Sequence, residues 1–190
     1  MEIRRYQSRD APAVRRLNEE VLRDAGTDPA DIPHPDDIED IQGAYLDTGG
    51  EFLVAEDAGS DATESSEIAS SAERSSADHS SGRSPREDGG TASTEQDAEV
   101  VGMGGLRVDG TEGELFRMRV AIDRQGEGIG TALLEALETA ARERGVEQLS
   151  AWTAKRQSAA VGFYPNHGYK QVETATRDPD YTLIHFRKEL

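Results

Sequence analysis

The sequence contains no cysteine in its 190 residues. This absence excludes disulfides, thiolate nucleophiles and cysteine-based metal sites. Long apolar runs are also missing, since none approaches the ~20 residues needed to span a bilayer, so we expect no membrane partner. The first ten residues are charged and lack the apolar core of a secretory signal. We therefore expect a cytoplasmic protein.

Positive charge is scarce, because 21 Lys and Arg residues face 38 Asp and Glu, for a net charge of −17. Such a surface repels phosphate backbones, so we exclude a nucleic-acid partner. Only Lys155, Lys170 and Lys188 are lysines. Abundant carboxylate with little lysine is typical of chains that stay soluble in concentrated salt, because salt screens the self-repulsion. We hypothesise a halophilic archaeal source, against the alternative of an ordinary acidic protein.

One segment, Gly59 to Asp97, is almost devoid of large apolar residues. It holds eleven serines, nine acidic residues and three arginines, and its one large apolar residue is Ile68. A stretch of this composition cannot bury enough apolar surface to offset its ordering entropy. We predict an acidic, serine-rich disordered insertion at 59–97, in the loop of a hairpin, within a single domain that spans 1–190.

The rest of the chain alternates between strand and helix patterns. We expect strands at 3–6, 51–56, 99–108, 113–122, 148–153, 169–172 and 181–188. We expect helices at 11–25, 36–48, 129–144 and 158–166, the first capped by Asp10 and followed by Gly26. This order predicts a mixed α/β fold, with a central twisted sheet, mostly antiparallel, flanked by helices.

The strongest local signal is a glycine-rich turn between a strand and a helix. Gly126, Gly128 and Gly130 place unpaired backbone N–H groups at a helix N-terminus, where a phosphate can approach closely. No lysine follows Gly130, so the turn is not a Walker loop, and the spacing does not fit a dinucleotide fingerprint. The alternative is a turn with no ligand.

Residues 124–134, RQGEGIGTALL, resemble the acetyl-coenzyme A (acetyl-CoA) signature of the GNAT N-acetyltransferase superfamily, Q/R-x-x-G-x-G/A followed by a helix. Residues 162–169, GFYPNHGY, look like that family's F-Y-x-x-x-G-F/Y segment. The resemblance implies a GNAT-like fold and an acyltransferase that moves an acetyl group from acetyl-CoA to an amine. We expect direct attack within a ternary complex, because no cysteine is present to carry the acyl group, and no metal, because no histidine has a partner at metal-ligand spacing.

The resemblance further implies roles for individual residues. The pyrophosphate of CoA would bind to the amides of Gln125, Gly126, Glu127, Gly128, Ile129, Gly130 and Thr131. The pantetheine arm would pair with the backbone of Met118 and Val120, and an amide of that strand would polarise the thioester carbonyl. Tyr164 would protonate the departing thiolate. Gln157 stands where many members have an asparagine that contacts CoA.

The regions that set acceptor specificity in this fold carry no motif here, so we expect only that the acceptor is a small-molecule or peptide amine. The oligomeric state is equally open between a monomer and a homodimer. Glu114, Glu51 and Glu56 are candidate bases by position only, and each is otherwise a solvated charge at a strand end. His185 is either a substrate-side residue or structural, and we expect Trp152 in the core. Two other functions stay open: a non-catalytic acyl-CoA-binding regulatory module, and an interaction scaffold that works through the acidic insertion.

Overall fold

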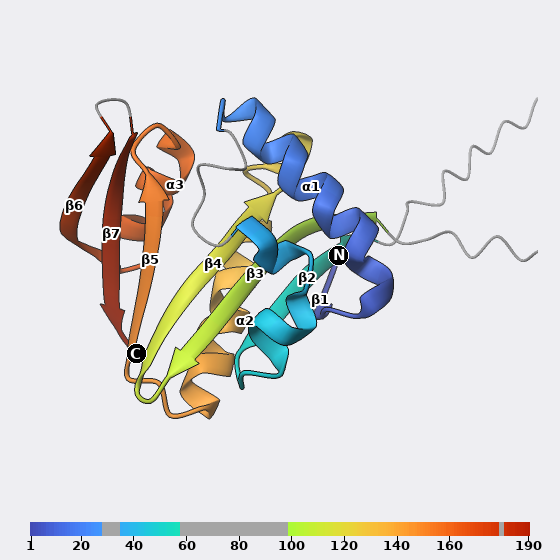
Figure 1. Ribbon diagram of the computed structural model, residues 1–190, viewed down its shortest axis with the longest axis horizontal. Helices are drawn as coiled ribbons and strands as arrows, with labels where there is room; N and C mark the ends of the chain where they lie inside the picture. The colour runs from blue at the N-terminus through green and yellow to red at the C-terminus, as the bar shows by residue number, and fades with distance from the viewer. Residues whose placement is uncertain (28–34, 58–98, 179–180) are drawn as a thin grey trace, which may run out of the picture. The chain divides into compact units, whose positions relative to one another are not determined.

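The computed structural model describes residues 1–27, 35–57, 99–178 and 181–190 (Figure 1). These residues form one sheet with helices packed on both faces. The predicted insertion at 59–97 lies outside the described residues. None of the described helices is long and apolar enough to cross a membrane.

A seven-stranded sheet of order β1-β2-β3-β4-β5-β7-β6 is the centre of the fold. Its strands are β1 (Glu2–Arg5), β2 (Glu51–Asp57), β3 (Glu99–Asp109), β4 (Glu112–Val120), β5 (Gln148–Ala154), β6 (Lys170–Asp178) and β7 (Tyr181–Glu189). Every pair is antiparallel except β4 with β5. The predicted mixed, mostly antiparallel α/β sheet is therefore confirmed.

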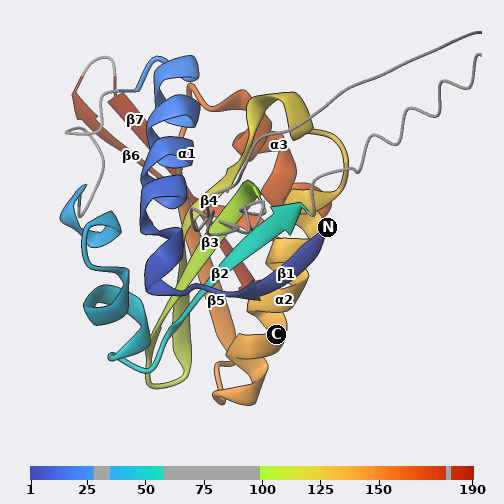
Figure 2. The ribbon, with the colours of Figure 1, turned by 90° about the vertical axis from the view of Figure 1, so that its right-hand side faces the viewer.

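Two apolar clusters cover the two faces of the sheet. On one face, α2 (Ile129–Glu143) and α3 (Ser158–Asn166) pack through residues such as Leu133, Leu137 and Tyr164. On the other face, α1 (Ala11–Asp24) packs with the short η3 (Pro35–Ile38) and η4 (Gln42–Leu46). Figure 2 shows α1 on one side of the strands and α2 on the other. We refer to these as the α2 face and the α1 face.

Glycines in β3 allow both layers to approach the sheet. A Cβ on Gly104 would lie 2.8 Å from Leu137 of α2, and one on Gly105 would lie 2.6 Å from the Tyr45 ring of η4. Real Cβ atoms essentially never come this close, so the two positions need glycine. The glycines that weaken the strand pattern in the sequence thus serve close packing.

The expected second helix is wrong in detail. Instead of one α-helix at 36–48, the chain forms a 3₁₀ turn, η3, and a π-helical turn, η4. The interruption places Asp37 in the interior, where it accepts hydrogen bonds from the Tyr45 hydroxyl at 2.5 Å and from Arg117 Nε at 2.9 Å. These tertiary contacts of Asp37 outweigh the local amphipathic pattern, which predicted one continuous α-helix.

The predicted cap at Asp10 is also wrong. Asp10 occupies the N-cap position of α1, but its side chain makes no cap hydrogen bond to the helix. Its carboxylate instead accepts from both terminal nitrogens of Arg4, at 2.7 and 2.8 Å, and from the backbone N–H of Gln7. Both carboxylate oxygens of Asp10 are therefore bonded to Arg4 of β1 and do not cap the helix. Gly26 does follow the helix with a φ of +59°, as the C-terminal signal predicts.

Two strand ends differ from the pattern. β4 ends at Val120, because Ala121 leads into a 3₁₀ turn, η5 (Ile122–Arg124), and Ile122 is 47% exposed. β6 continues well past residue 172, since pairing with β7 supplies hydrogen bonds that its sequence does not signal.

Candidate functional site

The sheet opens between its two parallel strands. β4 and β5 pair only from Glu112 opposite Gln148 to Leu115 opposite Ala151. Beyond that point β4 continues to Val120 and β5 to Ala154 without a shared register. Figure 1 shows the two strands meeting near the C-terminus and diverging toward the opposite edge. We call this space the opening.

A β-bulge bends β4 where it leaves β5. The register of β3 and β4 shifts between Met103 and Gly105, and Arg117 opposite this shift has a φ of +54°. A non-glycine residue in this region is strained, and such strain persists only where surrounding contacts hold it. The Asp37 carboxylate holds it, with its Oδ1 2.7 Å from Nη2 of the buried Arg117 guanidinium.

The bulge leaves backbone groups of β4 facing the opening. The N–H of Ala121 donates to the carbonyl of Val101 on β3, at 2.8 Å. Because backbone groups alternate along a strand, those of Val120 and Met118 point away from β3. Side chains reach both carbonyls: Gln125 Nε2 donates to the Val120 carbonyl at 3.3 Å, and Arg119 Nη1 donates to the Met118 carbonyl at 3.1 Å. The two residues predicted to pair with pantetheine therefore lie on the free edge.

The glycine-rich turn leads directly from η5 into α2. Gly126 and Gly128 both have a φ of +86°, and Gly128 is the N-cap of α2. The first N–H to bond within the helix is that of Ala132, to the Gly128 carbonyl. The amides of residues 129–131 therefore have no partner within the helix. The first turn contains no acidic residue, and the Glu127 carboxylate is held by Arg124 Nε at 2.9 Å. This end of α2 is suited to an anion.

The start of α2 is tied to α3 by His167, to which the sequence assigned no role. The His167 ring accepts at Nε2 from the Thr131 hydroxyl, at 3.0 Å, because its Nδ1 donates to the Phe163 carbonyl at 2.8 Å. Phe163 also lies 3.5 Å from the position of a Cβ on Gly130. Thr131, which is predicted to contact CoA, therefore also connects the two helices through His167, and Phe163 lies close to Gly130.

Tyr164 lies on α3 in an aromatic cluster. Its ring packs against Phe186, Tyr169 and Phe163, with centroids 5.4 to 5.5 Å apart, and it is 4% exposed. Burial raises the pKa of Tyr164 to about 12, although the charge of Arg119 opposes the shift. The phenol is therefore protonated at neutral pH, as a proton donor must be.

Gln157, the other residue predicted on this side, is the N-cap of α3. Its side-chain carbonyl accepts from the Thr153 hydroxyl of β5 at 3.0 Å. Its amide is thus held at the end of the strand that borders the opening.

Two of the three candidate bases are excluded by their contacts. Glu51 is not a solvated charge, since its buried carboxylate lies 2.6 Å from Arg144 and 2.8 Å from Arg5. Glu56 lies 2.6 Å from Arg4, whose hydrogen bond lowers the pKa of this carboxyl. Both lie on β2, which β3 separates from β4. Paired carboxylates so placed are poor bases for the opening.

Glu114 differs from those two. It is half-buried and stands opposite Ser150, next to the last residue pair that joins β4 to β5. Burial raises the pKa of its carboxyl, against the attraction of Arg107. It therefore remains a candidate base beside the opening.

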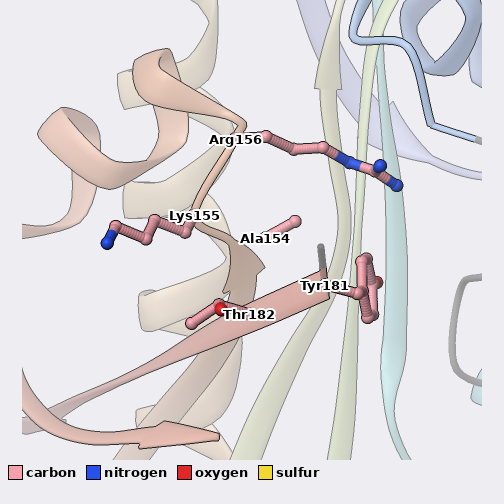
Figure 3. Close-up of a pocket in the computed structure, with 5 residues that line it drawn as sticks. All are labelled: Ala154, Lys155, Arg156, Tyr181 and Thr182. Atoms are coloured by element: carbon pink, nitrogen blue, oxygen red, sulfur yellow. The ribbon is translucent and has the colours of Figure 1, made fainter. Parts of the chain in front are cut away.

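A pocket of about 270 Å³ lies where β5 has parted from β4. The described residues that line it are Ala154, Lys155, Arg156, Tyr181 and Thr182. Figure 3 shows Arg156 and Tyr181 extending to the same side, with Lys155 pointing the other way, and the Arg156 guanidinium lies 5.2 Å from the centre of the Tyr181 ring. The lining residues all come from the end of β5, the turn after it and the start of β7, so the pocket lies on the β5 side of the opening.

Trp152 and His185 form a flat stack between the pocket and the closed part of the sheet. Their ring centroids are 4.1 Å apart with an interplanar angle of 8°. Trp152 is only half-buried, which corrects its expected core position, whereas His185 is 6% exposed. Burial lowers the pKa of His185, so the imidazole stays neutral near pH 7. Within the described ranges, no cluster of three or more His, Asp or Glu could hold a metal ion.

Comparisons with known proteins agree with this geometry. The model of the acetyltransferase (GNAT) family matches residues 60–169. The uncharacterised protein YxbD of Bacillus subtilis is 38% identical over an alignment of 68 residues, and the match covers 32% of this chain and 43% of that protein.

Solved structures extend the likeness to the whole chain. A GNAT acetyltransferase of Staphylococcus aureus Mu50 superposes with a TM-score of 0.69 at 16% identity, over 99% of this chain and 98% of that one. YncA of Salmonella typhimurium, solved with its cofactor acetyl-CoA, superposes with a TM-score of 0.64 at 16% identity, over 100% of this chain and 93% of that one. At these identities the likeness concerns the fold.

Proposed function

The chain belongs to the acetyltransferase (GNAT) family, and we propose that it transfers the acetyl group of acetyl-CoA to an amine on a small molecule or peptide. The observation that carries the proposal is the free edge of β4 next to the open N-terminus of α2. A thioester with a long amide-bearing arm and a diphosphate can use both features at once.

The donor would lie along these two features. The amides of the turn at 125–131 would bind the diphosphate, with Gly126 and Gly128 permitting its close approach. The backbone of Met118 and Val120 would pair with the pantetheine amides as a strand would, and the Gln157 amide offers a further contact. An N–H on this edge would then donate to the thioester carbonyl oxygen as negative charge develops there.

The reaction would be direct attack within a ternary complex. The neutral amine nitrogen adds to the thioester carbonyl carbon, the carbonyl re-forms, and the C–S bond breaks. Tyr164 gives its proton to the departing thiolate, which is consistent with the raised pKa of the phenol. The amine proton passes to water or to Glu114, the candidate base that adjoins the opening.

An acetylation screen tests this proposal. The purified protein is incubated with acetyl-CoA and polyamines, amino acids, aminoglycosides or N-terminal peptides, and free thiol is followed. Amine-dependent release of CoA is the expected result. Calorimetric binding of acetyl-CoA with no turnover on any amine would instead assign the protein as a non-catalytic acyl-CoA-binding module.

We also propose that the enzyme works in the cytoplasm, where acetyl-CoA is available, of an organism with concentrated intracellular salt. The support for the second part is the net charge of −17 with three lysines in 190 residues.

A further inference from the structure

Arg119 lies beside the opening on the face opposite α2. It stands opposite Met103 of β3, and Met103 belongs to the apolar cluster that packs under α1. Directly opposite residues share a face, so Arg119 is on the α1 face. It is half-buried, and its Nη1 reaches the Met118 carbonyl on the free edge of β4.

The Arg119 guanidinium lacks an acidic partner within the described ranges. Its one hydrogen bond there is to the Met118 carbonyl, and its Nε is buried without a partner. Other arginines of the fold behave differently: Arg4, Arg124 and Arg144 each lie within 2.7 Å of a carboxylate oxygen. In a chain with 38 acidic residues, an unpaired half-buried cation is an exception.

Asp37, the carboxylate whose charge acts on Arg119, already has other partners. Asp37 accepts from Arg117, from Arg107 Nη2 at 3.2 Å and from the Tyr45 hydroxyl. Burial, and then the like charge of Arg117, lower the pKa of Arg119 to about 10. The group remains a cation at neutral pH. A charge in these surroundings is stabilised by an anion that hydrogen-bonds to it.

We propose that Arg119 binds a carboxylate of the acceptor, so that the acceptor is an amino acid or a similar amine that carries an anionic group. The inference rests on the proposed function and names the substrate class of that site. The diphosphate of CoA is a poorer occupant, because the start of α2 lies on the other face. The half-buried Trp152 and the pocket beside Tyr181 lie across the opening, where the rest of such an acceptor would fit.

Paired acceptors test the inference. Each L-amino acid is compared with its own carboxamide, which keeps the amine and the side chain but loses the negative charge. We expect kcat/KM to be higher for the acid by about tenfold or more, the effect of one charge-assisted hydrogen bond. The amine of the carboxamide has the lower pKa, so a larger fraction of it is neutral at pH 7. Intrinsic reactivity therefore favours the carboxamide, the opposite of the expected preference.

Variants test whether the preference for the amino acid over its carboxamide depends on Arg119. Arg119→Gln should abolish the preference with unchanged calorimetric affinity for acetyl-CoA, and Arg119→Lys should restore part of it. Arg23→Gln removes the same charge from an exposed position, 73% exposed on α1, and should behave like the wild type. Equal use of acid and carboxamide by the wild type would overturn the inference. Equal slowing of both by Arg119→Gln would also overturn it, and would place Arg119 in donor chemistry.

A binding measurement separates this inference from the proposed function. Thermal melts are recorded with CoA and each L-amino acid or carboxamide, without turnover. A rise in Tm with the acids alone, absent in Arg119→Gln, supports the carboxylate site even if no amine is acetylated. The same melts without a carboxylate-dependent rise contradict it, whatever the activity screen shows.

Discussion

At the residue scale, Asp37 organises the side chains on the α1 face beside the opening. Its buried carboxylate holds Arg117 in its strained conformation and accepts from Arg107 and Tyr45. No sequence signal pointed to this role, because acidic residues after Pro35 are equally typical of the first turn of a helix. Its partner Arg117 is 80 positions away, and pairs this distant leave no periodic trace in a single sequence.

Tyr164 provides a direct kinetic test. Tyr164→Phe removes only the hydroxyl and should lower single-turnover acetylation by ~10²–10⁴-fold, the usual contribution of a general acid. Calorimetric affinity for acetyl-CoA should stay the same, because the ring contacts remain. Full activity with a lower melting temperature would instead show that Tyr164 serves packing alone.

Glu114 provides a pH test. Its folded pKa is raised by burial, so it contributes stability that is fully present below the unfolded pKa and is lost as pH rises through the folded value. Glu114→Gln should therefore be more stable than the wild type at pH 7, with a difference that shrinks as pH falls to 5. Urea melts at several pH values measure this. A gap that widens toward acid would contradict the assignment, and a ~10²-fold fall in kcat would identify Glu114 as the base.

At the element scale, the glycine turn before α2 is the local structure that the sequence predicted most closely. Gly126 and Gly128 do adopt the left-handed conformation, and the helix begins at Ile129. The strand-to-helix turn is local, so its chemistry can be read from neighbouring residues. The opening between β4 and β5 involves strands about 36 positions apart in sequence, and no local pattern predicts where they part; the family resemblance implied only that Met118 and Val120 pair with pantetheine.

Gly128 tests the turn against a matched control. Gly128→Ala puts a Cβ into open space but strains a φ of +86°, and Gly145→Ala does the same at +76° beyond the other end of α2. Both should lower stability by about 1 kcal/mol. Only Gly128→Ala should weaken acetyl-CoA binding, by about tenfold or ~1.4 kcal/mol. The reason is that Gly128 belongs to the turn whose amides are proposed to bind the diphosphate, whereas Gly145 lies at the other end of the helix. Equal affinities of the two variants in calorimetry would show that the glycine turn has no ligand.

At the scale of the whole molecule, the two strands that flank the insertion are paired to their ends. Asp57 of β2 stands opposite Glu99 of β3, so a short turn can join them. Deletion of residues 60–96 should leave a protein with a cooperative melt and the same affinity for acetyl-CoA, because the composition of the segment offers no core residues. Loss of the cooperative transition on deletion would show that the segment belongs to the folded core.

The net charge makes a second prediction for the molecule as a whole. Raising KCl from low to molar concentration should increase the melting temperature, because salt screens repulsion among the excess carboxylates. Thermal melts across a KCl series measure the effect, with sorbitol at matched osmolality as the control. A melting temperature independent of KCl would remove the halophilic hypothesis.

The four residue pairs between β4 and β5 are the only strand pairing that joins the two parts of the sheet among the described residues. Acetyl-CoA bound along the opening would act as a missing strand, so the ligand becomes part of the fold. Binding to the folded chain alone adds about 2.7 kcal/mol of stability at a hundred times Kd. If acetyl-CoA binds as proposed, the lifetime of this protein in the cell would be coupled to the acetyl-CoA pool, and a cell starved of acetyl donor would hold less of the protein without any change in its synthesis.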